Sequence, residues 1–124
     1  NIGLFCSTPM VALSRAVGRK AAMRMLLTGE MIPAAEALSL GLVSHVAAPG
    51  GLRAETNALA AAIASKSPLT LAIGKRAFYE QAEMATPAAY AHAAEVMTRN
   101  MLARDAEEGI DAFLEKRPPV WEGR

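Results

Sequence analysis

Apolar residues recur at helical spacing along most of this chain, and glycine or proline closes each run. The clearest run is Tyr90, Ala94, Met97 and Met101, whose members fall three or four positions apart. Residues at this spacing share one face of an α-helix, which has 3.6 residues per turn. Alanine, the best helix former, supplies 27 of the 124 residues, while the aromatic residues that strands favour supply 5%. We therefore expect a mainly helical chain.

Glycine, proline and capping residues divide the chain into predicted elements. Helices are expected to begin near residues 9, 19, 33, 52, 68, 86 and 105, and to end near residues 16, 27, 41, 66, 85, 101 and 117. Residues 1–8 are short, apolar and contain glycine, so they are expected to form the end of a strand or an approach loop. Residues 42–46 alternate in polarity and are β-branched, which predicts a short strand or extended segment.

Three helix starts carry a specific signal. Ser67 is followed by Pro68, which predicts that Ser67 caps the next helix and that Pro68 occupies its first turn. The pair Thr86-Pro87 repeats this pattern, so Thr86 is expected to be a second cap. Asp105 is expected to cap the last helix, which Arg117-Pro118-Pro119 ends.

The charge balance and the length of the apolar runs exclude two classes of partner. Lys and Arg number 13 and Asp and Glu number 12, a formal net charge of +1. Proteins that bind nucleic acid usually concentrate basic residues on one face. No apolar run approaches the roughly 20 residues of a membrane-spanning helix. We therefore expect neither a nucleic acid nor a membrane as a partner.

The single cysteine and the first residues bear on the cellular setting. Cys6 has no second cysteine to pair with, and a lone thiol is typical of a reducing compartment. The opening Asn-Ile-Gly-Leu-Phe-Cys has neither a basic region nor an initiator Met, so we expect neither a signal peptide nor a natural N-terminus there. The predicted location is cytoplasmic.

The titratable residues form no recognisable catalytic constellation. His45 and His92 lie on different predicted elements, without a Cys or carboxylate at metal-ligand spacing, so structural or surface roles are predicted and no metal site. Cys6 has two interpretations, a small buried hydrophobe, which we favour, or a nucleophile activated by a helix N-terminus. The residues alone therefore leave the chemistry open.

Four acidic residues gather in and after the first turn of the last predicted helix: Asp105, Glu107, Glu108 and Asp111. Negative charge at a helix N-terminus is favourable because it complements the helix dipole. A structural use of these residues is therefore predicted.

Several short motifs occur in the order in which one family carries them. They are Ser14-Arg15-Ala16-Val17-Gly18, Met25-Leu26-Leu27-Thr28-Gly29-Glu30, Ala35-Glu36-Ala37-Leu38, Gly41-Leu42-Val43-Ser44, Ser67-Pro68, Lys75, and the run from Glu108-Gly109-Ile110 through Glu115-Lys116-Arg117-Pro118. Over essentially its whole length the chain resembles the C-terminal half of the crotonase superfamily, the enoyl-CoA hydratase/isomerase family. Residues 1–9 resemble its enoyl-CoA hydratase domain-containing branch, which adds the mitochondrial matrix as an alternative location.

The resemblance implies a fold and an assembly. The family has an α/β spiral core of repeated ββα units followed by C-terminal helices that assemble trimers, often paired into hexamers. This stretch is therefore expected to be mainly α: residues 1–51 as the end of the spiral core, and residues 52–124 as a C-terminal helical oligomerisation domain. Helices with two apolar sides often pack against other subunits, which agrees with a homotrimer or hexamer.

The resemblance also implies what this stretch contributes. Family members bind an acyl-CoA thioester as substrate, without a further cofactor, and stabilise its enolate oxyanion with two backbone N–H groups. Those groups and the catalytic glutamates lie in family segments that precede Asn1, so no catalytic residue is expected within this stretch. Ile2, Leu4 and Phe5 are expected to line the acyl pocket. Met97 and Lys116 are expected to contact CoA, with Lys116 at the phosphate-bearing adenosine end.

One loop departs from the family pattern. Most hydratases carry a Gly-x-x-Pro-Gly-x-Gly-Gly loop where this chain has Gly3-Leu4-Phe5-Cys6-Ser7-Thr8-Pro9-Met10, which is one residue shorter and lacks those glycines. The first hypothesis is the C-terminal part of an enoyl-CoA hydratase-like lyase in fatty acid metabolism. The alternative is a catalytically degenerate crotonase-like protein that binds and assembles.

Overall fold

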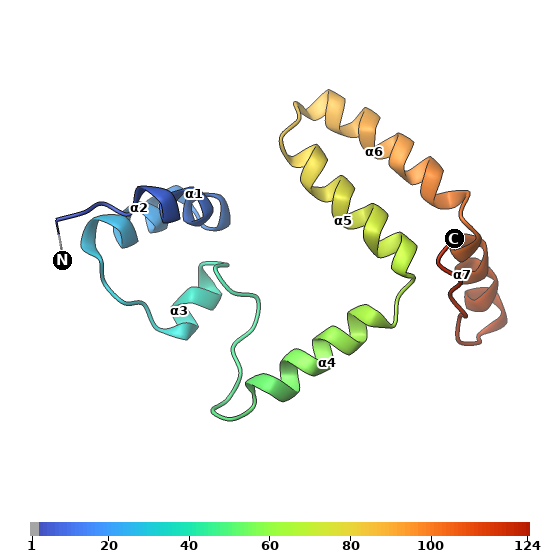
Figure 1. The fold of residues 1–124 in the computed structure, drawn as a ribbon, viewed down its shortest axis with the longest axis horizontal. Coiled ribbons are helices and arrows are strands. Elements are labelled where there is room, and N and C mark those ends of the chain that lie inside the picture. Colours follow the sequence, from blue (N-terminus) through green and yellow to red (C-terminus); the bar gives the residue numbers. More distant parts are fainter. Residues whose placement is uncertain (1–2) are drawn as a thin grey trace. The chain divides into compact units, whose positions relative to one another are not determined.

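A computed structural model describes residues 3–124 of the chain, and seven helices account for most of them (Figure 1). The helices are α1 (Ser7–Ala16), α2 (Arg19–Thr28), α3 (Ala34–Ser39), α4 (Leu52–Ala64), α5 (Pro68–Ala82), α6 (Thr86–Met101) and α7 (Arg104–Glu115). Residues 3–124 contain no strand. The predicted mainly helical character is confirmed. None of the helices described is long and apolar enough to cross a membrane.

The chain divides into two compact units, residues 1–56 and residues 57–124, with the division inside α4. The expected division fell at residues 51 and 52, at the start of the same helix. That these parts serve as a spiral core and an assembly domain stays a prediction.

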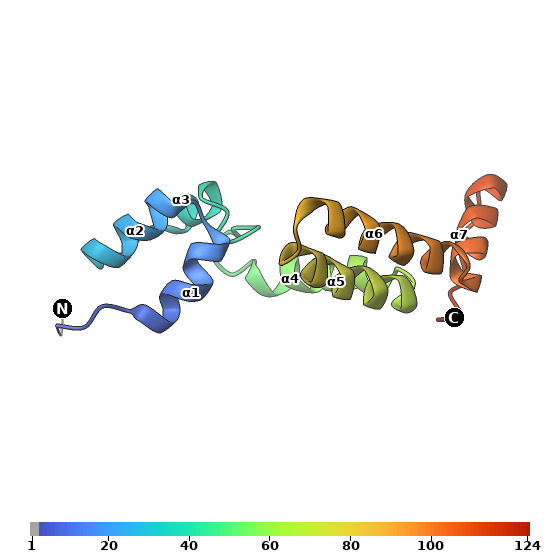
Figure 2. The same cartoon turned by 90° about the horizontal axis from the view of Figure 1, so that it is seen from above.

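In the first unit, α1 and α2 pack against each other and glycines define their limits (Figure 2). Gly18 precedes the first residue of α2, which confirms the predicted break between these helices. Gly29 ends α2 in the left-handed conformation at φ 63°, and its N–H donates to Met25 O. Glycine takes this conformation without a steric cost, so the predicted stop at Thr28-Gly29 is confirmed.

Residues 42–46 were expected to form a short strand or an extended segment, and the strand alternative is wrong. These residues form a turn and extended coil after α3, and the backbone N–H groups of Leu42 and Val43 both donate to Ala37 O. A strand needs a neighbouring strand for its backbone groups, and here the end of a helix supplies the acceptor instead. Helix α3 also starts one residue later than expected, because Pro33 is its N-cap rather than its first residue.

In the second unit, α5 and α6 lie side by side as a helical hairpin, and α7 packs against both (Figures 1 and 2). Ser67 caps α5: its Oγ accepts a hydrogen bond from the N–H of Thr70 at 3.1 Å, and Pro68 begins the helix. This confirms the predicted cap. Thr70 Oγ1 lies 3.3 Å from Asn100 Oδ1 and links α5 to α6.

Two other predicted caps are wrong. Ala85 is the N-cap of α6, and Thr86 is already its first helical residue, with Pro87 next to it in the first turn. Ala103 is the N-cap of α7, so Asp105 lies inside the first turn of that helix. In both places the helix begins earlier than the capping residue type indicated, and the side chain of Asp105 has a different use.

Candidate functional site

Asp105 is the most deeply buried large side chain of the part described, with 2% of its surface exposed. Its carboxylate accepts hydrogen bonds from Ser67 Oγ at 2.5 Å, from the N–H of Glu122 at 2.7 Å and from the N–H of Gly123 at 3.1 Å. The N–H of Asp105 donates in turn to Arg124 O at 2.9 Å. One residue of α7 thus holds the N-terminus of α5 and the C-terminal tail of the chain together.

Glu108, one turn further along α7, makes a second set of contacts with the tail. Arg117 donates two hydrogen bonds to its carboxylate, from Nη1 to Oε1 at 2.6 Å and from Nη2 to Oε2 at 2.9 Å. The N–H of Val120 also donates to Glu108 Oε1 at 2.8 Å. A forked arginine–carboxylate pair of this kind fixes direction as well as distance.

Both carboxylates are held in their charged form. The hydrogen bond from Ser67 lowers the pKa of Asp105, and the backbone N–H groups of Glu122 and Gly123 act in the same direction. The hydrogen bonds from Arg117 and from the N–H of Val120 lower the pKa of Glu108 to about 2, and Glu108 in turn raises the pKa of Arg117. Donors to a carboxylate stabilise its ionised form, which is why both shifts are downward.

Trp121 joins the tail to the link between α4 and α5. Its indole Nε1–H donates to Ser65 O at 2.8 Å. The same ring covers Gly109 so closely that an added Cβ would meet its edge at 3.4 Å. The structural use predicted for the acidic residues of α7 is therefore right for Asp105 and Glu108, although they bind the tail rather than simply complementing the helix dipole.

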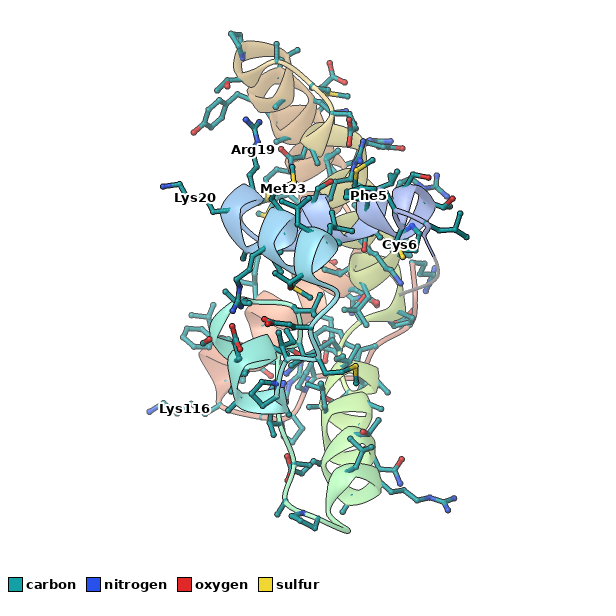
Figure 3. All side chains as sticks on the ribbon, turned by 90° about the vertical axis from the view of Figure 1, so that its left-hand side faces the viewer. Phe5, Cys6, Arg19, Lys20, Met23 and Lys116 are labelled. Carbon is teal, nitrogen blue, oxygen red and sulfur yellow. The ribbon has the colours of Figure 1, made fainter. Side chains whose placement is uncertain are left out.

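Lys116 follows the last residue of α7 and has an unusual backbone. Its φ and ψ are 56° and 38°, the left-handed region, and no other non-glycine residue of the part described has a positive φ. The N–H of Arg117 donates to Ala112 O at 3.0 Å, the bond that closes a helix whose terminal residue is left-handed. Glycine is usual at such a position, and another residue there costs ~1 kcal/mol or more. The Lys116 side chain is exposed and extends away from the ribbon (Figure 3).

Met97, the second residue expected to contact CoA, lies on α6 and not beside Lys116. It lines an open, mostly apolar hollow of about 270 Å³ between α5 and α6, with Ile73, Ala77, Phe78 and Val96 among the other lining residues. Met97 is 60% exposed. Lys116 lies at the end of α7 remote from α6, about 18 Å of helix beyond Arg104, so one chain does not bring the two residues together.

The residues expected to line the acyl pocket precede α1. Leu4 is 76% exposed and Phe5 is 48% exposed, and Phe5 is labelled at the start of α1 in Figure 3. Ile2 lies outside the described residues. Cys6 is also exposed, so the favoured interpretation of a small buried hydrophobe is wrong: it is the N-cap residue of α1 and lies in coil at the surface.

The histidines lie in separate places. His45 Nδ1 is 3.1 Å from Ser44 Oγ in the coil after α3. His92 Nε2 is buried between α6 and α5, 3.2 Å from Glu80 Oε2, without making an aligned hydrogen bond. Within residues 3–124, no group of three or more His, Cys, Asp or Glu side chains is placed to hold a metal ion.

Sequence reasoning missed the contacts that join α7 to the tail. Ser67 and Asp105 are 38 positions apart, and Arg117 reaches Glu108 across nine positions. The apolar spacing of α7 did not mark them, since Asp105 and Glu108 share the buried face of the helix with Ala112, whereas the apolar residues Ile110, Phe113 and Leu114 lie on its exposed face. The partner itself could not be chosen, because several basic residues follow.

Comparison with known proteins identifies the class. The model of the enoyl-CoA hydratase/isomerase family matches residues 1–124, the whole chain. The chain therefore belongs to the enoyl-CoA hydratase/isomerase family, and the resemblance to the crotonase superfamily is confirmed. The absence of strands from the part described agrees with the helical C-terminal part of that fold.

Individual relatives indicate the branch of the family to which the chain is most similar. Enoyl-CoA hydratase domain-containing protein 3, mitochondrial, of Mus musculus is 50% identical over 121 residues, which are 98% of this chain and 40% of the relative. A crystal structure of an enoyl-CoA hydratase from Mycobacterium smegmatis matches with a TM-score of 0.94 and 52% identity, covering 98% of this chain and 47% of that one. The human enoyl Coenzyme A hydratase domain-containing protein 3 matches with a TM-score of 0.93 and 50% identity, covering 98% and 48%. The chain thus spans about 40% of the length of the curated relatives it matches.

Proposed function

We propose that this chain serves as the C-terminal part of an acyl-CoA-binding protein that hydrates 2-enoyl-CoA thioesters. The family match over residues 1–124 carries the proposal, and the similarity to the Mycobacterium smegmatis enoyl-CoA hydratase supports it. The CoA thioester is the substrate, and no further cofactor is proposed. The oxyanion hole and the catalytic glutamates belong to the part of the family fold outside this stretch, which leaves the chain three contributions.

The first contribution is a wall of the acyl pocket, formed by Leu4 and Phe5 together with Ile2. Leu4 and Phe5 present large apolar surfaces ahead of α1 that its own unit leaves exposed. Exposed apolar side chains are suited to contact with an acyl chain. The second contribution is contact with CoA through Met97 and Lys116, where the polarizable thioether packs on the adenine and the ammonium meets a phosphate.

The third contribution is assembly into a homotrimer or hexamer. The second unit exposes large apolar side chains on α5, α6 and α7 and at the C-cap of α6. They are Phe78, Tyr79, Tyr90, Leu102, Phe113 and Leu114, which are between 64% and 83% exposed. Water-soluble monomers rarely leave so much apolar surface uncovered. Further copies of the same chain would bury these faces.

Location follows from the relatives. The mitochondrial name of the Mus musculus relative favours the matrix, the alternative location, over the cytoplasmic one expected from the lone thiol.

The test measures hydration of 2-enoyl-CoA substrates of increasing chain length by the full-length protein, which is the whole protein of which this chain is proposed to be the C-terminal part. The same measurement is made on its Leu4→Ala and Phe5→Ala variants. We expect turnover by the unmodified protein, and a shift of at least about threefold in the preference between short and long chains in the variants. Met31→Ala is the matched control, because Met31 is a 96% exposed apolar residue of the same unit outside the proposed pocket. Its preference should stay unchanged.

The outcomes separate the two candidate functions. Acyl-CoA binding without turnover would favour the catalytically degenerate binding and assembly protein, which the glycine-poor run Gly3–Met10 ahead of and into α1 supports. Variants that lose thermal stability while keeping the chain-length preference would show that Leu4 and Phe5 pack in the core instead.

A further inference from the structure

The left-handed backbone at Lys116 has a cost that a glycine would avoid. A strained residue persists only where the surrounding structure fixes it, and such residues gather at ligand-binding positions. Three contacts fix this one: the N–H of Arg117 to Ala112 O, the forked Arg117–Glu108 pair, and the N–H of Val120 to Glu108 Oε1. All three bind the residues immediately after Lys116 to the body of α7.

The charges around Lys116 are arranged to leave its ammonium available. Arg117 pairs with Glu115, which directly precedes Lys116 in sequence, and with Glu108 on the body of α7. Within residues 3–124, no carboxylate lies at ion-pair distance from Lys116 Nζ. Glu115, the acidic neighbour of Lys116 in sequence, therefore pairs with Arg117 and not with Lys116.

We propose that Glu108 and Arg117 are positioning residues that hold Lys116 in the left-handed conformation so that its ammonium meets the phosphate-bearing adenosine end of CoA. This inference rests on the proposed function, because it assumes that Lys116 contacts CoA. It adds a reason for a lysine at a glycine-type position. The left-handed turn directs the side chain outward from the end of α7, and the fork keeps the turn from relaxing into a continued helix or coil.

Arg117 has a structural role that a lysine could not fill. Arg117 is bound on both sides and faces Glu108, so it neutralises the site without contacting the ligand. A lysine at position 117 could not form the fork, because its single ammonium is a point donor. The two adjacent cations therefore have separate tasks, one structural and one for ligand contact.

The experiment compares binding of CoA and of dephospho-CoA, which lacks the 3′-phosphate, to the full-length protein by isothermal titration calorimetry. The readout is the ratio of the two dissociation constants, which a general loss of folded protein does not move. We expect CoA to bind about tenfold more tightly than dephospho-CoA. Lys116→Ala should bring the ratio close to one, and Arg117→Gln and Glu108→Gln should lower it to about two to three, with dephospho-CoA affinity unchanged.

Two further variants control for stability. Trp121→Phe removes the hydrogen bond from the same tail to Ser65 O without touching the fork, so it should loosen the tail and keep the ratio. Lys116→Gly removes the side chain and also the conformational strain, so it should melt higher than Lys116→Ala while losing the ratio equally. If Arg117→Gln fails to fold, Glu108→Gln answers the same question, because its amide oxygen still accepts from Val120 N–H.

The outcomes distinguish this inference from the function on which it rests. An unchanged ratio in Lys116→Ala would overturn the proposed CoA contact and the inference together. A ratio lost in Lys116→Ala but kept in both Glu108→Gln and Arg117→Gln would overturn the inference alone. If Trp121→Phe lowered the ratio of the two dissociation constants as much as Glu108→Gln and Arg117→Gln do, the inference would also be overturned, since any loosening of the tail would then have the same effect. A Lys116→Gly variant no more stable than Lys116→Ala would contradict the left-handed strain.

Discussion

The two units of this chain bury different kinds of side chain. In the first unit the buried residues described are Val17, Ala22 and Ala37, all small or medium and apolar. In the second unit they are Ala112 with Ser67, Asp105 and Glu108, so polar groups dominate. Apolar burial in the first unit is non-directional, whereas the hydrogen bonds of the second unit fix the geometry of a tail and a helix end.

The difference indicates where each unit needs a partner. Leu4 and Leu27 leave 69% or more of their surfaces exposed in the first unit, which suits a surface covered by other parts of a protein. At the end of α7 the second unit satisfies its buried charges internally. A binding residue supported in this way is held by its own chain, which is what precise ligand contact requires.

The largest expected effect is on the buried network of the second unit. Asp105→Ala removes the acceptor for Ser67 Oγ–H and for the N–H groups of Glu122 and Gly123, and leaves these donors without partners. We expect the melting temperature of the full-length protein to fall by about 5–10 °C. Differential scanning calorimetry measures it, with Asp111→Ala as the control, because Asp111 is an exposed carboxylate on the same helix. Equal falls in the melting temperatures of both variants would show that the second unit does not depend on the buried contacts of Asp105.

A smaller effect is expected from acid. The ordinary pKa of Glu108 is 4.5, and Arg117 and the N–H of Val120 lower it to about 2 in the folded chain. Well above pH 4.5 the carboxylate is ionised in both the folded and the unfolded chain, and its contribution to stability is complete. As the pH falls from about 4.5 to about 2, the unfolded chain takes up the proton first and that contribution is lost.

The Glu108→Gln variant isolates this contribution. Thermal unfolding at several pH values between 6 and 3 should show a gap between unmodified protein and variant that is constant above about pH 5 and narrows below pH 4.5. Other carboxylates titrate in both proteins and cancel in the difference. A gap independent of pH would mean that packing, and not the charge of Glu108, stabilises the tail.

The sequence predicted what local spacing determines. The helices followed from the period of their apolar residues, and the cap of α5 followed from Ser67 and Pro68, because the bond from Thr70 N–H spans three positions. The cap expected at Asp105 was wrong because its carboxylate pairs with Ser67 and the tail, far away in sequence. The strand expected at residues 42–46 was wrong because alternation does not reveal whether a neighbouring strand exists.

The site was predictable to a different degree. The family resemblance named Lys116 and Met97, but a sequence pattern gives neither the left-handed φ of Lys116 nor the fork that accompanies it. Both depend on where the chain turns after α7, and this is decided by Glu108 and Val120 together. Residues that position another residue are difficult to find from spacing alone, because their chemical type does not differ from that of any surface ion pair.

The smallest expected effect is on the ion pair of the first unit, Arg24 on α2 with Glu36 on α3. Arg24 is 47% exposed and Glu36 is 32% exposed, so water screens the pair and competes for both charges. Exposed pairs contribute about 0–1 kcal/mol, and Arg24→Ala should therefore lower the melting temperature by no more than about 2–3 °C. Arg19→Ala on the same helix is the control, since Arg19 is an exposed arginine outside this pair. If Arg24→Ala lowered the melting temperature as much as Asp105→Ala, the first unit would also depend on a polar contact between its helices. The two units would then differ in how exposed their polar contacts are, and not in how much each unit depends on them.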